Sequence, residues 1–412
     1  MSKTEMPSIR FYGFNNDWEQ RKLSEITDKV TEKNAGLQYV ETFTNSAEFG
    51  IISQRDFFDH DIAKLGSLDG YYIVKNEDFV YNPRISTSAP VGPINCNKLG
   101  RTGVMSPLYT VFRPHDIDTT YLEYFFKCGY WHSFMNFNGD SGARSDRFSI
   151  RDNVFFQMPI PIPDIDEQRK IGGLLTCLDN LITFHQRKFE KLTNVKKSML
   201  EKMFPRNGSC YPEIRFKGFT NPWEQRKLGD IGKARSGVGF PDAEQGRVTG
   251  IPFFKVSDMN LGGNENEMTV ANNYVTAEQI AVHRWSPIAE LPAIFFAKVG
   301  AAVMLNRKRL CRFPFLLDNN TMAYSLSSTK WDADFAKALF GTVDLTSLVQ
   351  VGALPSYNAR DVESMEIYLP SLLEQEQIGV FFKQLDHLIT LHQRELEKLQ
   401  SIKKALLEKM FV

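Results

Sequence analysis

Apolar residues recur at heptad spacing along two stretches of the chain, from Glu167 to Phe204 and from Glu374 to Phe411. Each position of the first stretch corresponds, without a gap, to the residue 207 places later in the second. An apolar seam sustained over more than four heptads is typical of a coiled-coil helix, so each stretch is predicted to form one long helix with a seam of about 50 Å. The predicted seam positions include Ile171, Leu178, Ile182, His185, Leu192 and Lys196 in the first copy, and Ile378, Leu385, Ile389, His392, Leu399 and Lys403 in the second.

Both copies of the seam carry polar residues at the same two places, His185 with His392 and Lys196 with Lys403. A polar residue inside a seam weakens the pair but penalises wrong registers. The matched interruptions therefore indicate that the two helices pair with each other within one chain. Replacing His185 and Lys196 by leucine is then expected to stabilise the pair and to loosen its alignment. The alternative is two unrelated surface helices whose polar seam residues face water.

A second repeated element contains tryptophan and precedes each globular part of the chain. Residues 9–23, with Trp18, recur as residues 214–228, with Trp223. Between the repeated ends, the interiors share few identities although their lengths are nearly equal. Divergent interiors on a duplicated scaffold are expected when two units do the same job on different targets. The predicted parts are a globular region at 1–163, a helix at 164–207, a second globular region at 208–370 and a second helix at 371–412.

The two interiors show short β-branched and aromatic runs bounded by Gly, Pro, Asn and Asp, which predict strands within a mixed α+β fold. Apolar residues at helical spacing predict helices in two further places. Strands are predicted at 71–74, 79–81, 108–112, 293–296 and 322–326, helices at 121–134 and 332–340, and long loops at 82–107 and 234–250.

Composition narrows the class of protein. The 412 residues, 42% hydrophobic and 24% charged, are typical of a folded chain with more than one domain. No apolar run is long enough for a membrane span, and the start has no signal-peptide core, so no membrane partner is expected. Five cysteines without metal-ligand spacing indicate the reduced thiols of a cytosolic protein. The formal net charge of zero argues against DNA binding by bulk charge, although only one face needs to be basic.

Motifs for catalysis are incomplete throughout the chain. Gly229–Ala234 lacks the spacing and final residue of a phosphate-binding loop, and Gly237–Gly239 offers only half of a dinucleotide fingerprint. The turns at 82–85 and 221–224 miss the Asn/Asp-Pro-Pro-Tyr/Phe motif of DNA amino-methyltransferases. Pro163–Asp164 is not followed by the Asp/Glu-x-Lys element of a metal-dependent nuclease. The chain is therefore predicted to be non-catalytic, with no metal and no cofactor of its own.

Basic residues in loop-like sequence leave binding as the remaining chemistry, because Arg and Lys serve phosphates and Arg can fork onto guanine. For any one of them, plain solvated surface is the simpler reading. The candidate DNA-binding residues are Arg84, Lys98, Arg101, Arg144 and Arg147 in the first region, and Lys255, Lys298, Asn306, Arg307, Lys308, Arg309 and Arg312 in the second.

In its motifs and their order the chain resembles the specificity (HsdS) subunits of type I restriction-modification systems. The resemblance covers essentially the whole chain. It is carried by the two Trp-Glu-Gln-Arg-Lys-Leu motifs, by Pro163…Glu167-Gln168 and Pro370…Glu374-Gln375 at the helix starts, and by Leu-Asp-x-Leu-Ile-Thr-x-His-Gln-Arg at 178–187 and 385–394.

The resemblance implies two target-recognition domains, held apart by an antiparallel pair of long helices with pseudo-two-fold symmetry. Each domain would read one half of a bipartite double-stranded DNA site. Two methyltransferase subunits would dock on the helices, and restriction subunits would add translocation and cleavage. S-adenosylmethionine, ATP and Mg²⁺ would be bound by these partners. The main alternative is a duplicated coiled-coil scaffold that binds proteins instead of DNA.

Overall fold

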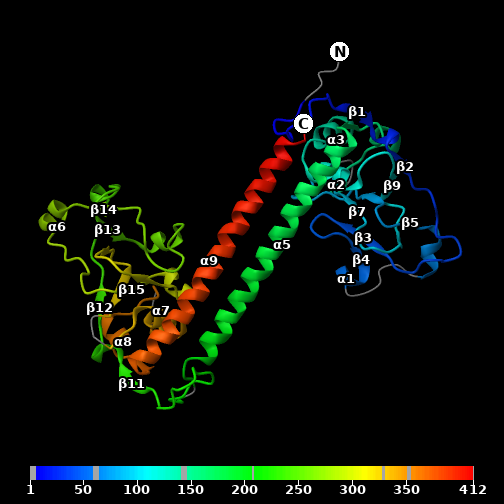
Figure 1. Cartoon of the computed structure of the whole chain (residues 1–412). Helices are drawn as coiled ribbons and strands as arrows, with labels where there is room; N and C mark the ends of the chain where they lie inside the picture. The colour runs from blue at the N-terminus through cyan, green and yellow to red at the C-terminus, as the bar shows by residue number, and fades with distance from the viewer. Residues whose placement is uncertain are drawn as a thin grey trace. The chain divides into compact units, whose positions relative to one another are not determined.

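The computed structural model describes residues 6–58, 65–140, 146–206, 208–326, 330–349 and 354–411. It divides into two compact units, one made of Met1–Phe184 with Leu396–Val412 and the other of His185–Glu395. Each long helix contributes to both units, and each unit is described by itself below (Figure 1).

The first unit is built on a four-stranded antiparallel sheet in the order β2-β9-β6-β7. Val80 lies opposite Val111 at its centre, and both side chains are buried. Smaller pairs are β3 with β4, β5 with β8, and β1 with β10. Its elements are β1 (Glu19–Lys22), β2 (Thr27–Lys29), β3 (Phe43–Ser46), β4 (Gly50–Ser53), α1 (Gln54–Phe58), β5 (Tyr72–Val74), β6 (Phe79–Tyr81), β7 (Ile94–Cys96), β8 (Gly103–Met105), β9 (Thr110–Pro114), α2 (Thr119–Lys127), α3 (His132–Asn138), α4 (Asp152–Phe155) and β10 (Pro159–Ile162).

The second unit repeats this plan with a four-stranded antiparallel sheet in the order β12-β18-β15-β16. A three-stranded sheet, β14-β13-β17, and the pair β11 with β19 complete it. Its elements are β11 (Glu224–Lys227), β12 (Lys233–Ser236), β13 (Ile251–Phe254), β14 (Tyr274–Val275), α6 (Ala277–His283), β15 (Ala293–Ala297), β16 (Lys308–Cys311), β17 (Leu316–Leu317), β18 (Thr321–Ser325), α7 (Ala333–Thr342), α8 (Ala359–Glu363) and β19 (Glu366–Leu369).

Short 3-10 helices connect many of these elements. They are η1 (Leu23–Glu25), η2 (Leu65–Gly70), η3 (Leu228–Asp230), η4 (Asp242–Glu244), η5 (Val256–Asn260), η6 (Ala301–Leu305) and η7 (Leu345–Leu348).

The mixed α+β content is confirmed, and all five predicted strands are present as β5, β6, β9, β15 and β18. Three expectations were wrong in detail, and one of them is the predicted loop at 234–250, whose first residues belong to β12. The predicted helix at 121–134 is two helices, because Cys128 takes an extended backbone and interrupts the helical hydrogen bonding between α2 and α3. The predicted loop at 82–107 contains β7 and β8, whose runs of three residues are too short for a period to be read.

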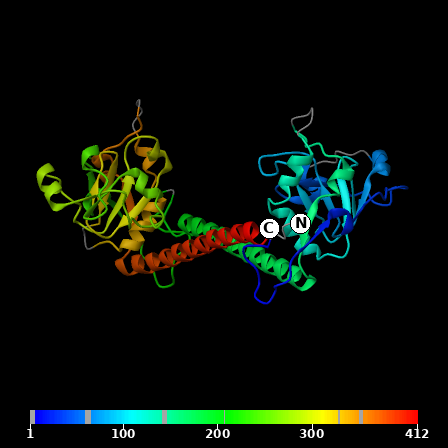
Figure 2. The same ribbon diagram turned by 90° about the horizontal axis from the view of Figure 1, so that it is seen from above.

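The two long helices are α5 (Ile165–Lys202) and α9 (Leu372–Lys409), each of 38 residues. They run antiparallel, as their opposite colour gradients show in Figure 1 and Figure 2. Within the first unit the start of α5 lies beside the end of α9, and within the second unit the end of α5 lies beside the start of α9. The predicted antiparallel helix pair is therefore confirmed. Within the part of the chain that the structure describes, no helix has the length and apolar character needed to cross a bilayer.

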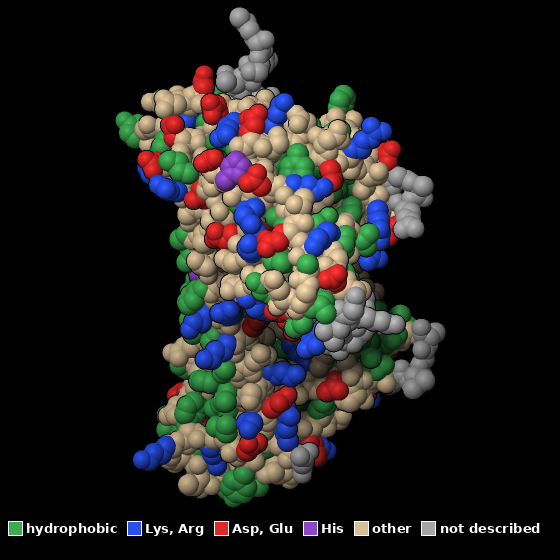
Figure 3. Space-filling model, turned by 90° about the vertical axis from the view of Figure 1, so that its right-hand side faces the viewer, with side chains coloured by type: hydrophobic (Ala, Val, Ile, Leu, Met, Phe, Trp, Pro, Cys, Tyr) green, Lys and Arg blue, Asp and Glu red, His purple; other side chains and the backbone are tan. Residues whose placement is uncertain are grey.

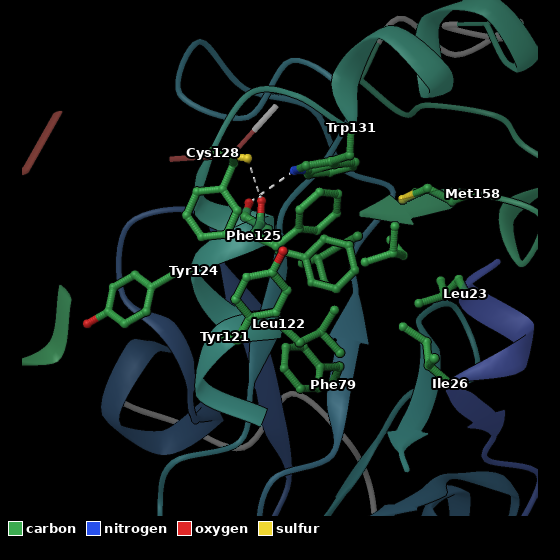
Figure 4. Packing of buried hydrophobic residues seen from close by; sticks show 14 of the residues in the cluster. Leu23, Ile26, Phe79, Tyr121, Leu122, Tyr124, Phe125, Cys128, Trp131 and Met158 are labelled. Atoms are coloured by element: carbon green, nitrogen blue, oxygen red, sulfur yellow. Dashed lines mark hydrogen bonds between the residues drawn. The ribbon is translucent and has the colours of Figure 1, made fainter. Parts of the chain in front are cut away.

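The core of the first unit lies between its main sheet and α2. Figure 4 shows Tyr121, Leu122 and Phe125 of α2 within this core, and Tyr124, which is also buried, donates its hydroxyl to Asp179 of α5 at 2.7 Å. Phe411, just beyond the end of α9, is buried in the same core, with its ring centre 5.4 Å from that of Tyr121.

The second unit is closed in the same way by the end of the other long helix. Phe204, just beyond α5, is buried with its ring centre 5.7 Å from Phe335 of α7 and 5.9 Å from Trp223. Each long helix therefore starts after one globular region and ends inside the core of the other.

Candidate functional site

The seam between the long helices is the first candidate site, and its predicted side chains lie on one face. Ile171, Leu178, Ile378 and Leu385 are buried. The other eight are half-buried: Ile182, His185, Leu192, Lys196, Ile389, His392, Leu399 and Lys403. This burial is produced by heptad spacing, because every third or fourth residue returns to the same side of a helix.

The two seam histidines contact each other directly. The Nδ1 atoms of His185 and His392 are 3.0 Å apart, so one ring donates a hydrogen bond and the other accepts it. Burial lowers the pKa of His392, and the nearby His185 and Lys188 lower it further. A protonated pair would lose this bond, so the contact requires at least one neutral ring.

The two seam lysines form ion pairs with aspartates of the opposite helix. Lys196 of α5 donates to Asp386 of α9, and Lys403 of α9 donates to Asp179 of α5. Asp386 also accepts from Lys337 of α7 at 2.6 Å, and burial lowers the pKa of that lysine. Sequence reasoning missed both aspartates, although each follows a seam leucine directly.

Because of these contacts, Lys196→Leu is expected to destabilise the helix pair, whereas the sequence pattern predicted that leucine would stabilise it. Asp386 is 7% exposed, so losing one of its two lysines leaves a nearly buried carboxylate less well compensated. We expect Lys196→Leu to lower the free energy of unfolding by about 1–3 kcal/mol, measured by denaturant unfolding. The triple variant Lys196→Leu/Lys337→Leu/Asp386→Leu removes all three charges of this cluster and should regain most of the loss. A Lys196→Leu protein more stable than the wild type would contradict the role of this ion pair.

The tryptophan motif of each module is attached to the first turns of the long helix that follows it. Arg10 donates two hydrogen bonds to Glu167 of α5, at 2.7 and 2.8 Å, and the Nε1 of Trp18 donates a third to the same carboxylate at 3.2 Å. The second module repeats the arginine pair, with two hydrogen bonds of 2.7 Å from Arg215 to Glu374 of α9. Both carboxylates are buried, so each pair fixes the start of its helix.

Apolar side chains also remain exposed on the outer face of each long helix. Leu181 and Phe184 of α5 are 40% and 49% exposed, and the corresponding Leu388 and Leu391 of α9 are 41% and 45% exposed. The duplicated scaffold therefore carries a duplicated pair of exposed apolar residues, spaced by three positions on one helix face. We call these the outer apolar pairs.

Most candidate DNA-binding residues of the second region make contacts within their own unit. Lys308 donates to Asn306 and to the carbonyl of Val343, and burial lowers the pKa of Lys308 to about 8. Arg307 donates to Asn260 at 2.7 Å, and Arg309 donates to the carbonyl of Asn264 at 2.6 Å. This cluster therefore stabilises the loops around β16.

The remaining candidates of the second region are held by contacts within the unit or are partly buried. Arg312 forms ion pairs with Glu267 and Asp334. Lys255 donates to Gln245 at 2.7 Å. Lys298 is half-buried, and burial lowers its pKa.

In the first region the structure separates the candidates into two groups. Lys98 pairs with Glu123 at 3.5 Å, and Arg101 makes a two-bond contact with Glu41 at 2.7 and 2.8 Å. Arg144 lies outside the described residues. Arg84 and Arg147 make no side-chain hydrogen bond or ion pair with any residue that the structure describes.

Arg84 and Arg147 come together at a cleft of about 620 Å³ in the first unit. Its other lining residues are mostly polar or aromatic and include Asn45, Gln54, Asn82 and Tyr109. Asn82 donates to the carbonyl of Asn45, whose own amide donates to the carbonyl of Val80, so the wall of the cleft is fixed to the main sheet.

Charged side chains of both signs lie at the surface of the protein. On the face shown in Figure 3, Lys and Arg side chains lie among Asp and Glu side chains. Within the described ranges, no group of three or more His, Cys, Asp or Glu side chains is placed to hold a metal ion.

Comparison with known families gives a match to each module. A family model described as the type I restriction modification DNA specificity domain matches residues 15–194 and again residues 220–401.

Curated relatives are specificity subunits from Methanocaldococcus jannaschii. The putative type I restriction enzyme MjaX specificity subunit is 23% identical over an alignment of 440 positions. The alignment covers 98% of this chain and 94% of the relative. The MjaVIII specificity subunit is also 23% identical, over 62% of this chain and 61% of the relative, less than two thirds of its length.

Solved structures show the same fold. The S subunit of a type I restriction-modification system from M. genitalium matches with a TM-score of 0.62 and 14% identity over 99% of both chains. A structure described for complex assembly and conformational transition of the type I R-M system matches with a TM-score of 0.50 and 13% identity, over 97% of this chain and 99% of that one.

Proposed function

The chain belongs to the type I restriction-modification DNA specificity family, and on that premise we propose that each of its globular regions reads one half of a bipartite double-stranded DNA site. It is a specificity subunit with two target-recognition domains. The observation that carries the proposal is the duplication itself, because the family model matches both modules and both main sheets have the same strand order. Repeated sheets with divergent loops suit two recognition domains with different half-sites.

We further propose that the long helices set the distance between the half-sites. A rigid antiparallel pair holds two recognition domains at one separation. Half-sites contacted from one side of B-DNA are then centred about one helical turn, or roughly 10 bp, apart. Support comes from the two 38-residue helices, whose ends are each anchored in a globular core by Phe204 and Phe411.

The outer apolar pairs are proposed as docking points for two methyltransferase subunits. Exposed apolar residues gathered on one helix face commonly mark a protein interface. Leu181 with Phe184, and Leu388 with Leu391, occupy corresponding positions of the repeat, so two copies of one partner would meet similar surfaces. Restriction subunits would join this assembly to supply translocation and cleavage in the bacterial or archaeal cytoplasm.

The chemistry of methyl transfer and cleavage is assigned to those partners. In this proposal the chain is not itself an enzyme, and S-adenosylmethionine, ATP and Mg²⁺ are bound by the other subunits. Binding of S-adenosylmethionine to the purified chain alone would contradict this division of labour.

Methylome sequencing tests the proposed function. Cells carrying this gene with its methyltransferase partner should methylate a motif with two half-sites and an unspecified spacer, and cells lacking the gene should not. Exchanging residues 24–150 for those of another specificity subunit should change one half-site only. A methylated motif that persists without the gene, or an exchange that changes both half-sites, would contradict the proposal.

A further inference from the structure

The two units share a short two-stranded ribbon beside the main sheet. In the first unit it pairs Arg84 with Arg147, and in the second it pairs Val299 with Ser356, both antiparallel. One strand of each ribbon follows the corresponding sheet strand, β6 or β15, and the other precedes the corresponding short helix, α4 or α8.

Backbone hydrogen bonds establish the correspondence residue by residue. In the first ribbon, the N–H of Phe148 donates to the carbonyl of Pro83 at 2.7 Å, and that of Ile85 donates to the carbonyl of Asp146 at 3.0 Å. The second ribbon repeats these bonds. There the N–H of Tyr357 donates to the carbonyl of Lys298 at 3.3 Å, and that of Gly300 donates to the carbonyl of Pro355 at 2.9 Å. Arg84 therefore corresponds to Val299, and Arg147 to Ser356.

The side chains at the two positions of the first ribbon are placed unfavourably for the free protein. Residues directly opposite in an antiparallel pair point to the same face, and like charges in that arrangement destabilise the pair. Neither guanidinium forms an ion pair with a carboxylate among the described residues, although Glu48 lines the same cleft, whereas Arg101 of the same region is paired with Glu41. A ligand rich in hydrogen-bond acceptors would supply the missing compensation.

The two-stranded backbone of this site indicates which kind of ligand it can bind. A two-stranded ribbon fits the major groove of B-DNA, where the fork of an arginine matches the O6 and N7 acceptors of guanine. Arg84 is exposed and Arg147 half-buried at the same 620 Å³ cleft, so both lie at an accessible surface. Resting on the function proposed above, we infer that Arg84 and Arg147 read guanines in the half-site of the first recognition domain.

The second ribbon has the same backbone hydrogen bonds but different side chains, so it should recognise a different half-site. Val299 offers only an apolar contact, which suits the methyl group of thymine, and Ser356 offers a hydroxyl that does not discriminate strongly. At the corresponding positions, the second half-site should therefore not require guanine. Divergence at two aligned positions explains how one backbone plan serves two target sequences.

Methylome sequencing and competition binding with the full chain and its methyltransferase subunits test this assignment. Arg84→Ala and Arg147→Ala should each relax one guanine position of the same half-site, with discrimination reduced about 5- to 150-fold. The other half-site and the spacer should not change. Arg21→Ala is the matched control, since its side chain donates to the carbonyl of Glu25 away from the cleft, and its removal should leave both half-sites intact.

Lysine variants separate base reading from phosphate binding. Arg84→Lys and Arg147→Lys keep the charge and the ribbon but lose the fork, so they should relax specificity almost as much as alanine. Two results would overturn the assignment of the two arginines but not the proposed function. One is alanine variants that bind all sequences more weakly and keep the same half-site, and the other is lysine variants with full specificity. A wild-type complex that methylates no bipartite motif would instead overturn the proposed function.

Discussion

Replacement of Phe411 by alanine is expected to destabilise the first recognition domain by about 3–5 kcal/mol, the usual cost of removing a buried phenylalanine. Phe411 is 3% exposed and packs against Tyr121 and Phe125, almost three hundred residues earlier in the chain. Hydrogen exchange followed by mass spectrometry should show faster exchange in β6 and β9, with β15 and β18 little changed. Because two units need not unfold together, this local measurement is preferred to a single melting temperature.

Two variants complete this test. Phe204→Ala is the mirror change and should accelerate exchange in the second unit, where Phe204 packs against Trp223 and Phe335. Phe137→Ala removes a side chain that is 89% exposed and should change neither unit. Faster exchange only near the end of α9, with an unaffected sheet, would show that Phe411 does not support the core.

Insertion of four residues at matched places in α5 and α9 is expected to lengthen the spacer of the DNA target by one or two base pairs. Four residues add about 6 Å of helix, against about 3.4 Å for each base-pair step. An insertion of this size is a stutter, which locally unwinds a coiled coil without removing its seam. The half-site sequences should remain the same, because the recognition domains are unaltered. Methylome sequencing reads the spacer and both half-sites in one experiment.

The matched control places the same four residues in the loop between Ser209 and Glu213, outside both helices. That insertion should leave the spacer unchanged. If the helix insertions altered the half-site bases and kept the spacer, the helix pair would not set the distance.

The helices illustrate what a pattern along the chain can predict. Heptad spacing identifies the seam because it depends only on the period of the α-helix, and the duplication identifies the partner. The structure places His185 against His392, whereas the sequence pattern named no partner for the two lysines. Asp179 and Asp386 are adjacent to the seam in sequence, and they become ion-pair partners only when two helices cross in one register.

The basic residues illustrate the opposite case. Loop-like sequence predicts exposure but not the partner of a charge. Lys308 and Arg309 are held by carbonyl groups around β16, whereas Arg84 and Arg147 have no such partner among the described residues. Their pairing depends on a ribbon between segments that are 63 residues apart, which no local pattern reveals.

The sequence by itself determined the duplication, the helix period, the mixed class and the family, because each depends on the order and spacing of residue types. Only the tertiary structure decided which charges are satisfied inside the protein, which core each helix end closes, and which two arginines face one cleft. Those outcomes depend on distances between segments remote in the chain, and the free energy of a charge or a ring depends on what surrounds it there.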